Sequence, residues 1–401
     1  MKININKIRL VPKSITNQNF EFCVFGQPDE EISKWIAENG FKSYSNGKYT
    51  NISISGSKIE SLASIFDDAD VFEWLDGFSP NLNKKLHIGH FSNLVLGKAF
   101  LSLGIAKNTV SIYGDTLEGE ITKEDAISAL EIYHNLFDFH PNASYFASEM
   151  QFFQFGENNM LVEGEGQYAG TMIFNIDEET KVVGIKTNGQ TSYFYQDVCL
   201  AAELNAATLY LTGKEQDNHF KTLKRLFPVI SHIGLGLVRV SGQKMSSRIG
   251  NVILIDEFIE LVKNDFENNM QLIYNVFAGF ILKSAPEVDK GINLDIISNP
   301  KNSSGLYISY TMARLQSAGC SVIRVDGFKD LSLQFALLKS KVNLKPNILF
   351  EALLEHCKEI NALYAENKIS GNSENKIMFE NLLSDLVYGA EKLGMFVVDK
   401  V

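Results

Sequence analysis

The chain has 401 residues, of which 45% are hydrophobic, and a formal net charge of -11 at pH 7. This length predicts two or three domains with ample apolar core. The acidic balance argues against a protein that coats nucleic acid indiscriminately, because such binding is driven by Lys and Arg. Lysine clusters at 83–86 and 219–227 still allow a local basic face.

The four cysteines lie far apart in the sequence and form no C-x-x-C pair, so neither a zinc site nor a disulfide framework is indicated. No apolar run has membrane-spanning length, and the first residues lack a secretory signal. We therefore expect a reduced, cytoplasmic protein with no membrane partner and no tightly bound metal.

Residues 1–70 are predicted to form a small α+β module. The stretches FEFCVFG (20–26) and YTNISIS (49–55) have strand composition. Between them, DEEISKWIAENG (29–40) has helical spacing and a glycine stop.

Residues 71–300 are predicted to form a doubly wound, Rossmann-type α/β domain. FEWLDGF (72–78) is typical of a short strand, the residues after Gly89 have helical periodicity, and TVSIYGD (109–115) is typical of a second strand. Such a βαβ unit implies a parallel sheet. Further along, ATLYLTG (207–213) is predicted as a buried strand that precedes a helix.

The remaining segments divide into strands and helices. GTMIFNI (170–176), VVGIKTN (182–188), SYFYQDV (192–198) and GLVRVSG (236–242) are predicted strands, and residues 256–285 are expected to be helical. Residues 301–401 are predicted to form an all-helical bundle.

The stretch LHIGH (86–90) is the first with chemical meaning. It lies where the first predicted strand passes into a helix, whose N-terminal N–H groups attract anions. Gly89 allows a ligand to approach the backbone, since it has no Cβ. His87 and His90 offer hydrogen bonds to phosphate oxygens whose charge grows in a transition state.

A second stretch, SGQKMSSRIGN (241–251), places a lysine, a methionine and two serines in a loop between a strand and a helix. A cationic loop flanked by glycines is suited to close over a triphosphate. Lys244 would neutralise charge as pyrophosphate leaves.

In this order the two stretches resemble the signatures of class I aminoacyl-tRNA synthetases. FSPNLNKKLHIGH (78–90) is similar to the arginyl-tRNA synthetase signature, and three more stretches resemble that family. These are TSYFYQDV (191–198), GKEQDNHFKTL (213–223) and KMSSRIGNVILIDEFIE (244–260). ISYTMARLQS (308–317) resembles the start of the family's anticodon-binding bundle, so the resemblance runs from about residue 70 to the end.

The resemblance implies a role for each matching residue. Arginine would be bound by Asp76, Ser79, Asn81, Tyr193, Asp197 and Gln216. ATP would be bound by His87, Gly89, His90, Lys244, Met245, Ser246 and Ser247, among which His87, His90 and Lys244 would be catalytic. Tyr310 and Arg314 would contact tRNA. Independently of the resemblance, the carboxylates of Asp76 and Asp197 suit a guanidinium, which presents several N–H donors in one plane.

The implied activity is ATP-dependent formation of arginyl-adenylate, with Mg²⁺ accompanying ATP, and transfer of arginine to tRNA(Arg) by a monomeric ligase of protein biosynthesis. The sequence also departs from the family. YGDTLEGEI (113–121) matches its expected stretch only at Asp115, Met312 replaces a histidine, and the insertion between the catalytic halves is shortened. Two alternatives therefore stay open: a paralogue that passes arginine to a peptide or small metabolite, and a non-catalytic tRNA-binding or regulatory relative.

Overall fold

The structure is a computed structural model that describes residues 1–11, 21–54, 62–82, 84–114, 122–150, 161–241, 253–367, 369 and 373–401. These residues form two compact units, Met1–Asp70 with Thr311–Glu391 and Val71–Tyr310 with Lys392–Val401. The N-terminal module thus shares a unit with most of the C-terminal helices, and the division into three domains remains a prediction. None of the helices in these ranges combines the length and the apolar character that a membrane span requires.

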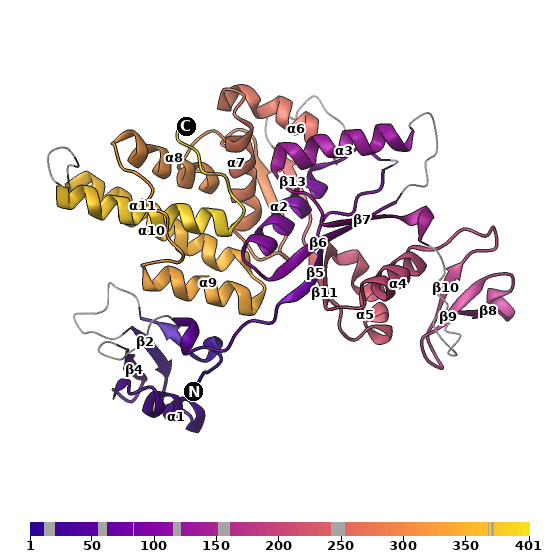
Figure 1. Cartoon of the computed structure of the whole chain (residues 1–401), viewed down its shortest axis with the longest axis horizontal. Helices are drawn as coiled ribbons and strands as arrows, with labels where there is room; N and C mark the ends of the chain where they lie inside the picture. Colours follow the sequence, from indigo (N-terminus) through magenta and orange to yellow (C-terminus); the bar gives the residue numbers. More distant parts are fainter. Residues whose placement is uncertain are drawn as a thin grey trace. The chain divides into compact units, whose positions relative to one another are not determined.

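A five-stranded parallel sheet forms the centre of the larger unit (Figure 1). Its strand order is β12-β11-β5-β6-β7. In that order the strands are Ser231–Leu235, Thr208–Gly213, Phe72–Asp76, Ala106–Tyr113 and Ala143–Phe146. The chain runs outward from β5 to β7 and later from β11 to β12 on the other side. This confirms the doubly wound, Rossmann-type fold and places the reversal of direction between β5 and β11.

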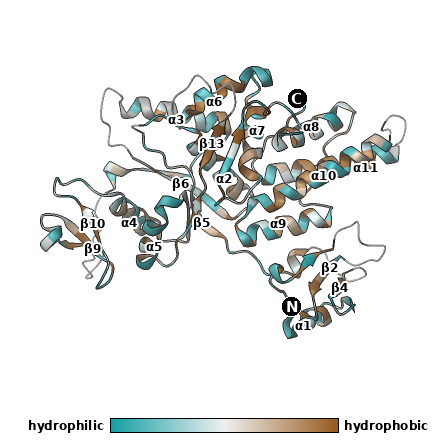
Figure 2. Ribbon diagram, turned by 180° about the vertical axis from the view of Figure 1, so that it is seen from behind, coloured by the Kyte–Doolittle hydropathy of each residue, from teal (hydrophilic) through white to brown (hydrophobic). Residues whose placement is uncertain are grey.

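Helices cover both faces of this sheet. On one face, Phe91 of α2 (Ile88–Ser102) stacks on Phe137 of α3 (Lys123–Phe137) and on Phe277 of α7 (Met270–Leu282), with ring centroids 4.5 and 4.0 Å apart. Figure 2 shows that α7 is apolar along most of its length, as a helix buried on several sides must be. On the other face, residues of α4 (Tyr193–Leu204) and α5 (Asp217–Leu226) pack around Tyr210 of β11.

The predicted strand over 192–198 is wrong, because these residues begin helix α4. Its tyrosines, phenylalanine and valine have strand propensity, and the window is too short to reveal a helical period. Ser192 supplies the missing start signal, since its Oγ accepts a hydrogen bond from the Tyr195 N–H at 3.1 Å. In a helix, Tyr193 and Asp197 are four residues apart and lie on the same face.

The helical stretch expected over 256–285 is confirmed, but it is divided. The structure has two helices there, α6 (Ile255–Val262) and α7, separated by a turn. Glu267 and Asn268 in this turn have φ angles of +50° and +59°, which a continuous right-handed helix excludes.

The larger unit also contains two smaller sheets. One is antiparallel and has the order β10-β9-β8, with strands Lys181–Ile185, Met172–Asn175 and Leu161–Glu163. The other pairs β13 (Val238–Ser241) in parallel with β14 (Lys290–Asn293). Helix α8 (Ser304–Ser317) follows and crosses the boundary between the units.

In the smaller unit an antiparallel sheet has the order β1-β2-β4-β3, and the helices are α1, α9, α10 and α11. The strands are Arg9–Leu10, Phe22–Phe25, Tyr49–Ser53 and Lys42–Ser45 in sheet order, and the helices are Glu30–Glu38, Leu331–Asn343, Pro346–Glu366 and Ser373–Lys392. Phe335 of α9 enters the core of the N-terminal module, with its ring 5.6 Å from that of Phe22.

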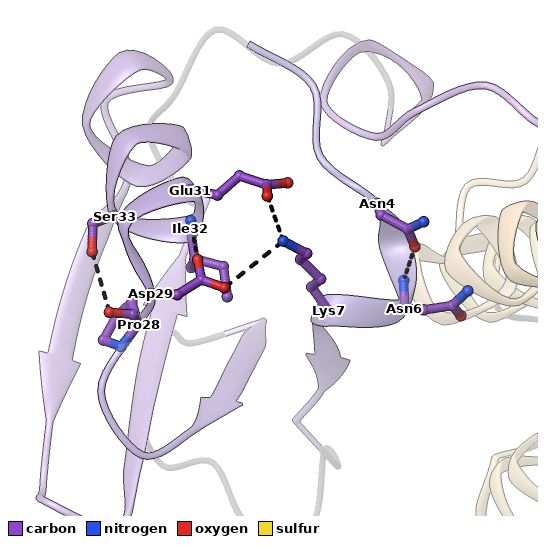
Figure 3. Close-up of polar contacts among 8 residues, drawn as sticks. All are labelled: Asn4, Asn6, Lys7, Pro28, Asp29, Glu31, Ile32 and Ser33. Carbon is purple, nitrogen blue, oxygen red and sulfur yellow. Dashed lines mark hydrogen bonds and ion pairs between the residues drawn. The ribbon is translucent and has the colours of Figure 1, made fainter.

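Asp29 starts α1 in this module, since its Oδ1 accepts the Ile32 N–H at 2.8 Å. Lys7 contacts both Asp29, at 3.8 Å, and Glu31 (Figure 3). The same carboxylate therefore caps the helix and joins it to the first residues of the chain.

Candidate functional site

The N-terminus of α2 is closed by its own two histidines. His87 is the N-cap residue, and its Nδ1 accepts a hydrogen bond from the Gly89 N–H at 3.0 Å. His90 Nδ1 in turn accepts the His87 N–H at 3.1 Å. The two rings stack with centroids 3.9 Å apart. The two histidine side chains thus hold one another and the start of the helix in place.

These hydrogen bonds assign the imidazole tautomers. Because each Nδ1 is an acceptor, the proton of each neutral ring lies on Nε2. Burial, together with the charge of the neighbouring His87, lowers the pKa of His90 to about 4, and burial also lowers the pKa of His87. At neutral pH both rings are therefore uncharged Nε2–H donors.

Gly89 is required by the packing of the His87 ring. A Cβ at this position would lie 2.8 Å from His87 Cε1 and 2.9 Å from Nδ1. Any other residue would therefore displace the ring and weaken the cap.

His87, Gly89 and His90 line a cleft of about 760 Å³ at the carboxyl ends of β5 and β11. Its other walls come from the turn after β11, from the segment Leu235–Val240 and from Ile253. Parallel α/β sheets bind ligands at this edge, beside the reversal of strand order.

The loop with Lys244, Met245, Ser246 and Ser247 lies outside the described residues. The segment that follows it is tied directly to α2. The Ile88 N–H donates to Ile253 O at 3.0 Å, and the Ile255 N–H donates to Leu86 O at 3.0 Å. Two stretches that are more than 160 residues apart in the sequence are thereby joined beside the cleft, which Ile88 and Ile253 both line.

A second cavity of about 420 Å³ adjoins the cleft and shares Asp76, Ser79, Thr212 and Gln216 with it. All six residues expected to contact arginine line this cavity. They come from the end of β5, from the loop after it, from α4 and from the turn after β11, so the fold brings the whole predicted set together. Their role in binding remains a prediction.

Asp76 is almost completely buried in this second cavity, with 4% of its surface exposed. Ser79 donates its hydroxyl to Asp76 Oδ1 at 2.5 Å, which favours the ionised form. Burial outweighs this bond and, helped by the charge of Asp197, raises the pKa of Asp76 to about 7. A cation in the cavity would reverse this shift by pairing with the carboxylate.

Asp197 has a partner that the sequence analysis did not include in the site. His219 on α5 places its Nε2 2.6 Å from Asp197 Oδ2. The histidine ring is held edge-on between Phe194 and Phe220, with centroid distances of 5.3 and 5.0 Å. The available signal was its place within GKEQDNHFKTL, one of the stretches that carries the resemblance, but its contact with Asp197 depends on the tertiary packing of α4 and α5.

Asn81 and Tyr193 complete the rim of this cavity. Asn81 Nδ2 donates to the Tyr193 hydroxyl at 3.3 Å, and the Leu82 N–H donates to Gly114 O at 2.8 Å. A Cβ on Gly114 would lie 2.1 Å from Asn81 Oδ1, so the glycine leaves room for the amide. Tyr193 itself is 68% exposed.

The two residues expected to contact tRNA lie outside these cavities. Tyr310 on α8 is 41% exposed. Arg314 belongs to the smaller unit, where its guanidinium donates to Asn361 Oδ1 at 2.8 Å and lies 4.2 Å from the centre of the Tyr364 ring. Its assignment to tRNA remains a prediction. Among the residues that the structure describes, no group of three His, Cys, Asp or Glu side chains is arranged to hold a metal ion.

Sequence comparison finds relatives that are named arginine–tRNA ligase. The chain is 26% identical over 255 residues to an arginine–tRNA ligase of Limosilactobacillus reuteri, which covers 51% of this chain and 45% of the relative. It is 29% identical over 202 residues to an arginine–tRNA ligase of Streptococcus pneumoniae, covering 43% and 35% respectively. The chain thus matches about half the length of these relatives, or less. No family model matches the chain.

Solved structures agree in fold. The arginyl-tRNA synthetase of Thermus thermophilus superposes with a TM-score of 0.65 at 13% identity, over 98% of this chain and 96% of that one. The arginyl-tRNA synthetase of Plasmodium falciparum gives 0.65 at 17% identity, over 98% and 94%. The resemblance found in the sequence is therefore confirmed: the chain is related to arginyl-tRNA synthetases and has their fold.

Proposed function

We propose that this chain, a divergent relative of the arginyl-tRNA synthetases, activates L-arginine with ATP and transfers it to the 3′ end of tRNA(Arg). One observation carries the proposal. The cavity that holds Asp76 and Asp197 opens beside the cleft that holds His87 and His90. A cation-binding pocket next to a phosphate-binding helix terminus suits an amino acid with a cationic side chain and a nucleotide.

The guanidinium is the part of arginine that this pocket would select. Its lining residues, all of them described, include two carboxylates and no Lys or Arg. A guanidinium presents several N–H donors in a plane and pairs with more than one acceptor at once. Asp76 and Asp197 would accept these hydrogen bonds, and Tyr193 would cover the opening.

ATP would occupy the larger cleft, with its α-phosphate at the start of α2. The arginine carboxylate would attack the α-phosphorus in line, forming the acyl–phosphate bond as the bond to pyrophosphate breaks. The Nε2–H groups of His87 and His90 would donate to the phosphate oxygens. No protein nucleophile takes part, so catalysis consists of positioning and electrostatic stabilisation.

Neutral imidazoles donate hydrogen bonds but add no positive charge. The charge that develops on the triphosphate must therefore be balanced by other groups. The N-terminal dipole of α2 is one of them. The Mg²⁺ that accompanies ATP is the second, and Lys244 is the third, proposed from its place in the KMSS stretch.

In the second step the terminal adenosine of tRNA would attack the arginyl-adenylate, and AMP would leave. We also propose a monomeric enzyme in the cytoplasm, where its tRNA substrate is found. Sedimentation of the purified chain, alone and with tRNA, tests the oligomeric state.

Arginine-dependent ATP–pyrophosphate exchange, with and without total tRNA, tests activation, and transfer of labelled arginine to tRNA tests charging. Lysine and citrulline are suitable comparison substrates, because one has a different cationic head and the other is a neutral isostere of arginine. Exchange with charging is the expected result. Exchange without charging would overturn the proposed acceptor, and no arginine-dependent exchange under either condition would overturn the activity.

A further inference from the structure

One buried hydroxyl beside the second cavity has no hydrogen-bond partner in the part of the chain that the structure describes. Tyr210 on β11 is fully buried, with its ring 4.8 Å from that of Phe220. Among the described residues, its hydroxyl oxygen has no hydrogen-bond partner. Such an unsatisfied group costs about 1–3 kcal/mol, so its presence in a packed core calls for an explanation.

The sheet places Tyr210 on the same face as Asp76. Tyr210 is paired with Asp76 across β11 and β5, so both side chains leave the sheet on the same face. Thr212, two residues further along β11, points to that face as well and lines both cavities. Tyr210 packs there against Phe194 and other residues of α4, the helix that carries Asp197.

The hydroxyl is suited to donate rather than to ionise. Burial, together with the negative charges of Asp197 and Asp76, holds the pKa of Tyr210 well above its ordinary value. A neutral phenol next to carboxylates can only lower its energy by donating its proton in a hydrogen bond.

Asp197 has an oxygen available to accept this bond. Its Oδ2 is engaged by His219, at 2.6 Å. Its Oδ1 has no hydrogen bond to any residue in the described part of the chain. Within the described residues, the carboxylate is therefore held through Oδ2 alone.

We propose that Tyr210 is a positioning residue, whose hydroxyl donates to Asp197 Oδ1 when a cationic side chain fills the cavity. With His219 on one oxygen and Tyr210 on the other, the carboxylate is oriented toward the guanidinium. This inference rests on the proposed function, since it takes arginine as the ligand. It adds a residue that does not line the cavity and is too deeply buried to touch the substrate.

Calorimetric titration of Tyr210→Phe with arginine, citrulline and ATP tests the proposal. Loss of a hydrogen bond to a charged group should weaken arginine binding about tenfold. ATP binding should be unchanged, and citrulline should lose less than arginine, because a neutral head draws less on the charge of Asp197. The melting temperature should stay the same or rise, since the hydroxyl removed has no partner in the empty site.

Tyr274→Phe is the matched control. Its hydroxyl is also fully buried and without a hydrogen-bond partner among the described residues, but its ring lies against Phe91, Phe137 and Phe396 on the other face of the sheet. Arginine affinity should be unaffected there. An equal loss in both variants would mean a general packing effect and would overturn the proposal.

The double variant Tyr210→Phe, Asp197→Asn separates positioning from any loss of structure. If Tyr210 acts through Asp197, the double variant should bind arginine no more weakly than Asp197→Asn alone. Additive losses, or an arginine affinity of Tyr210→Phe equal to that of the wild type, would overturn the inference while leaving the proposed function intact. Failure of the wild-type chain to bind arginine would instead defeat the proposed function, and this inference with it.

Discussion

The start of α2 and the carboxylate cavity are neighbours in one unit, yet they are built in opposite ways. At the helix start, His87, Gly89 and His90 satisfy one another over four consecutive residues. In the cavity, Asp76 and Asp197 come from β5 and α4 and are held by partners from the following loop and from α5. One site is local and uncharged, whereas the other is assembled from distant segments and concentrates negative charge.

The contrast suggests how each site treats its ligand. A triphosphate brings its own charge and counter-ion, so the helix start needs only fixed donors and a dipole. A cationic side chain needs carboxylates that are already partly dehydrated. Burying the Asp76 carboxylate next to Asp197 is therefore electrostatically unfavourable, and a cationic ligand would relieve this penalty. The helix start carries no comparable penalty.

The largest expected effect is on the pH dependence of the unfolding free energy, which measures the electrostatic penalty of burying Asp76. Because its folded-state pKa of about 7 lies above the unfolded value of 3.8, its contribution to stability is complete below pH 4 and is lost as the pH rises through 7. The wild-type chain should lose about 4 kcal/mol of unfolding free energy over this range that Asp76→Asn does not lose.

Urea unfolding of both proteins between pH 4 and pH 8 measures this difference. Asp67→Asn, at an exposed aspartate, is the control and should follow the wild type. If the unfolding free energies of wild type and Asp76→Asn changed in parallel with pH, burial of Asp76 would carry no such penalty. The electrostatic contrast between the two sites would then be refuted.

The next effect concerns the phosphate side. His90→Ala removes one Nε2–H donor and the acceptor for the His87 N–H, so arginine activation should fall about 100-fold. Arginine binding should change little, because His90 does not line the second cavity. Pyrophosphate exchange at saturating arginine, set against calorimetric arginine affinity, separates the two quantities. A loss of arginine affinity as large as the loss of rate would contradict the division of labour between the sites.

Asp197→Asn makes the complementary change. It keeps the shape of the side chain and removes its charge, so arginine affinity should fall about 20-fold while ATP affinity stays the same. The affinity for citrulline should fall less than that for arginine, because citrulline is neutral and depends less on the charge of Asp197. If arginine bound to this variant as to the wild type, the cavity would not be the guanidinium site.

The smallest effect is expected for Gly89→Ala. The new Cβ would lie 2.8 Å from His87 Cε1 and would push the ring off its rotamer, at about 1 kcal/mol, which lowers the activation rate about fivefold. Alanine favours a helix over glycine by about 1 kcal/mol, which offsets this strain, so thermal stability should hold. Exchange kinetics and a melting curve together check this. An unchanged rate would mean that the stacked histidine pair is not needed for activation.

Local patterns in the sequence anticipated the α2 start and the βαβ unit correctly. The two histidines and their glycine lie within one turn, where spacing alone determines which groups can meet. The strand predicted over 192–198 failed because its aromatic and branched residues have strand propensity, although the fold buries Phe194, Tyr195 and Val198 with helical spacing. His219 and Tyr210 were missed because their importance lies in what they contact.

The sequence by itself predicted the doubly wound fold and the histidines at a helix start, and its resemblance to arginyl-tRNA synthetases named the residues expected to contact arginine. The fold and the helix start depend on hydrophobic periodicity and on a glycine at a crowded turn, which act over short stretches of chain, whereas the arginine contacts depend on the resemblance alone. Only the tertiary structure decided that Asp76 and Asp197 share a cavity, that His219 engages one of them and that the Tyr210 hydroxyl meets no partner among the described residues. Burial and through-space charge set these properties, and both arise only when β5, β11, α4 and α5 pack together.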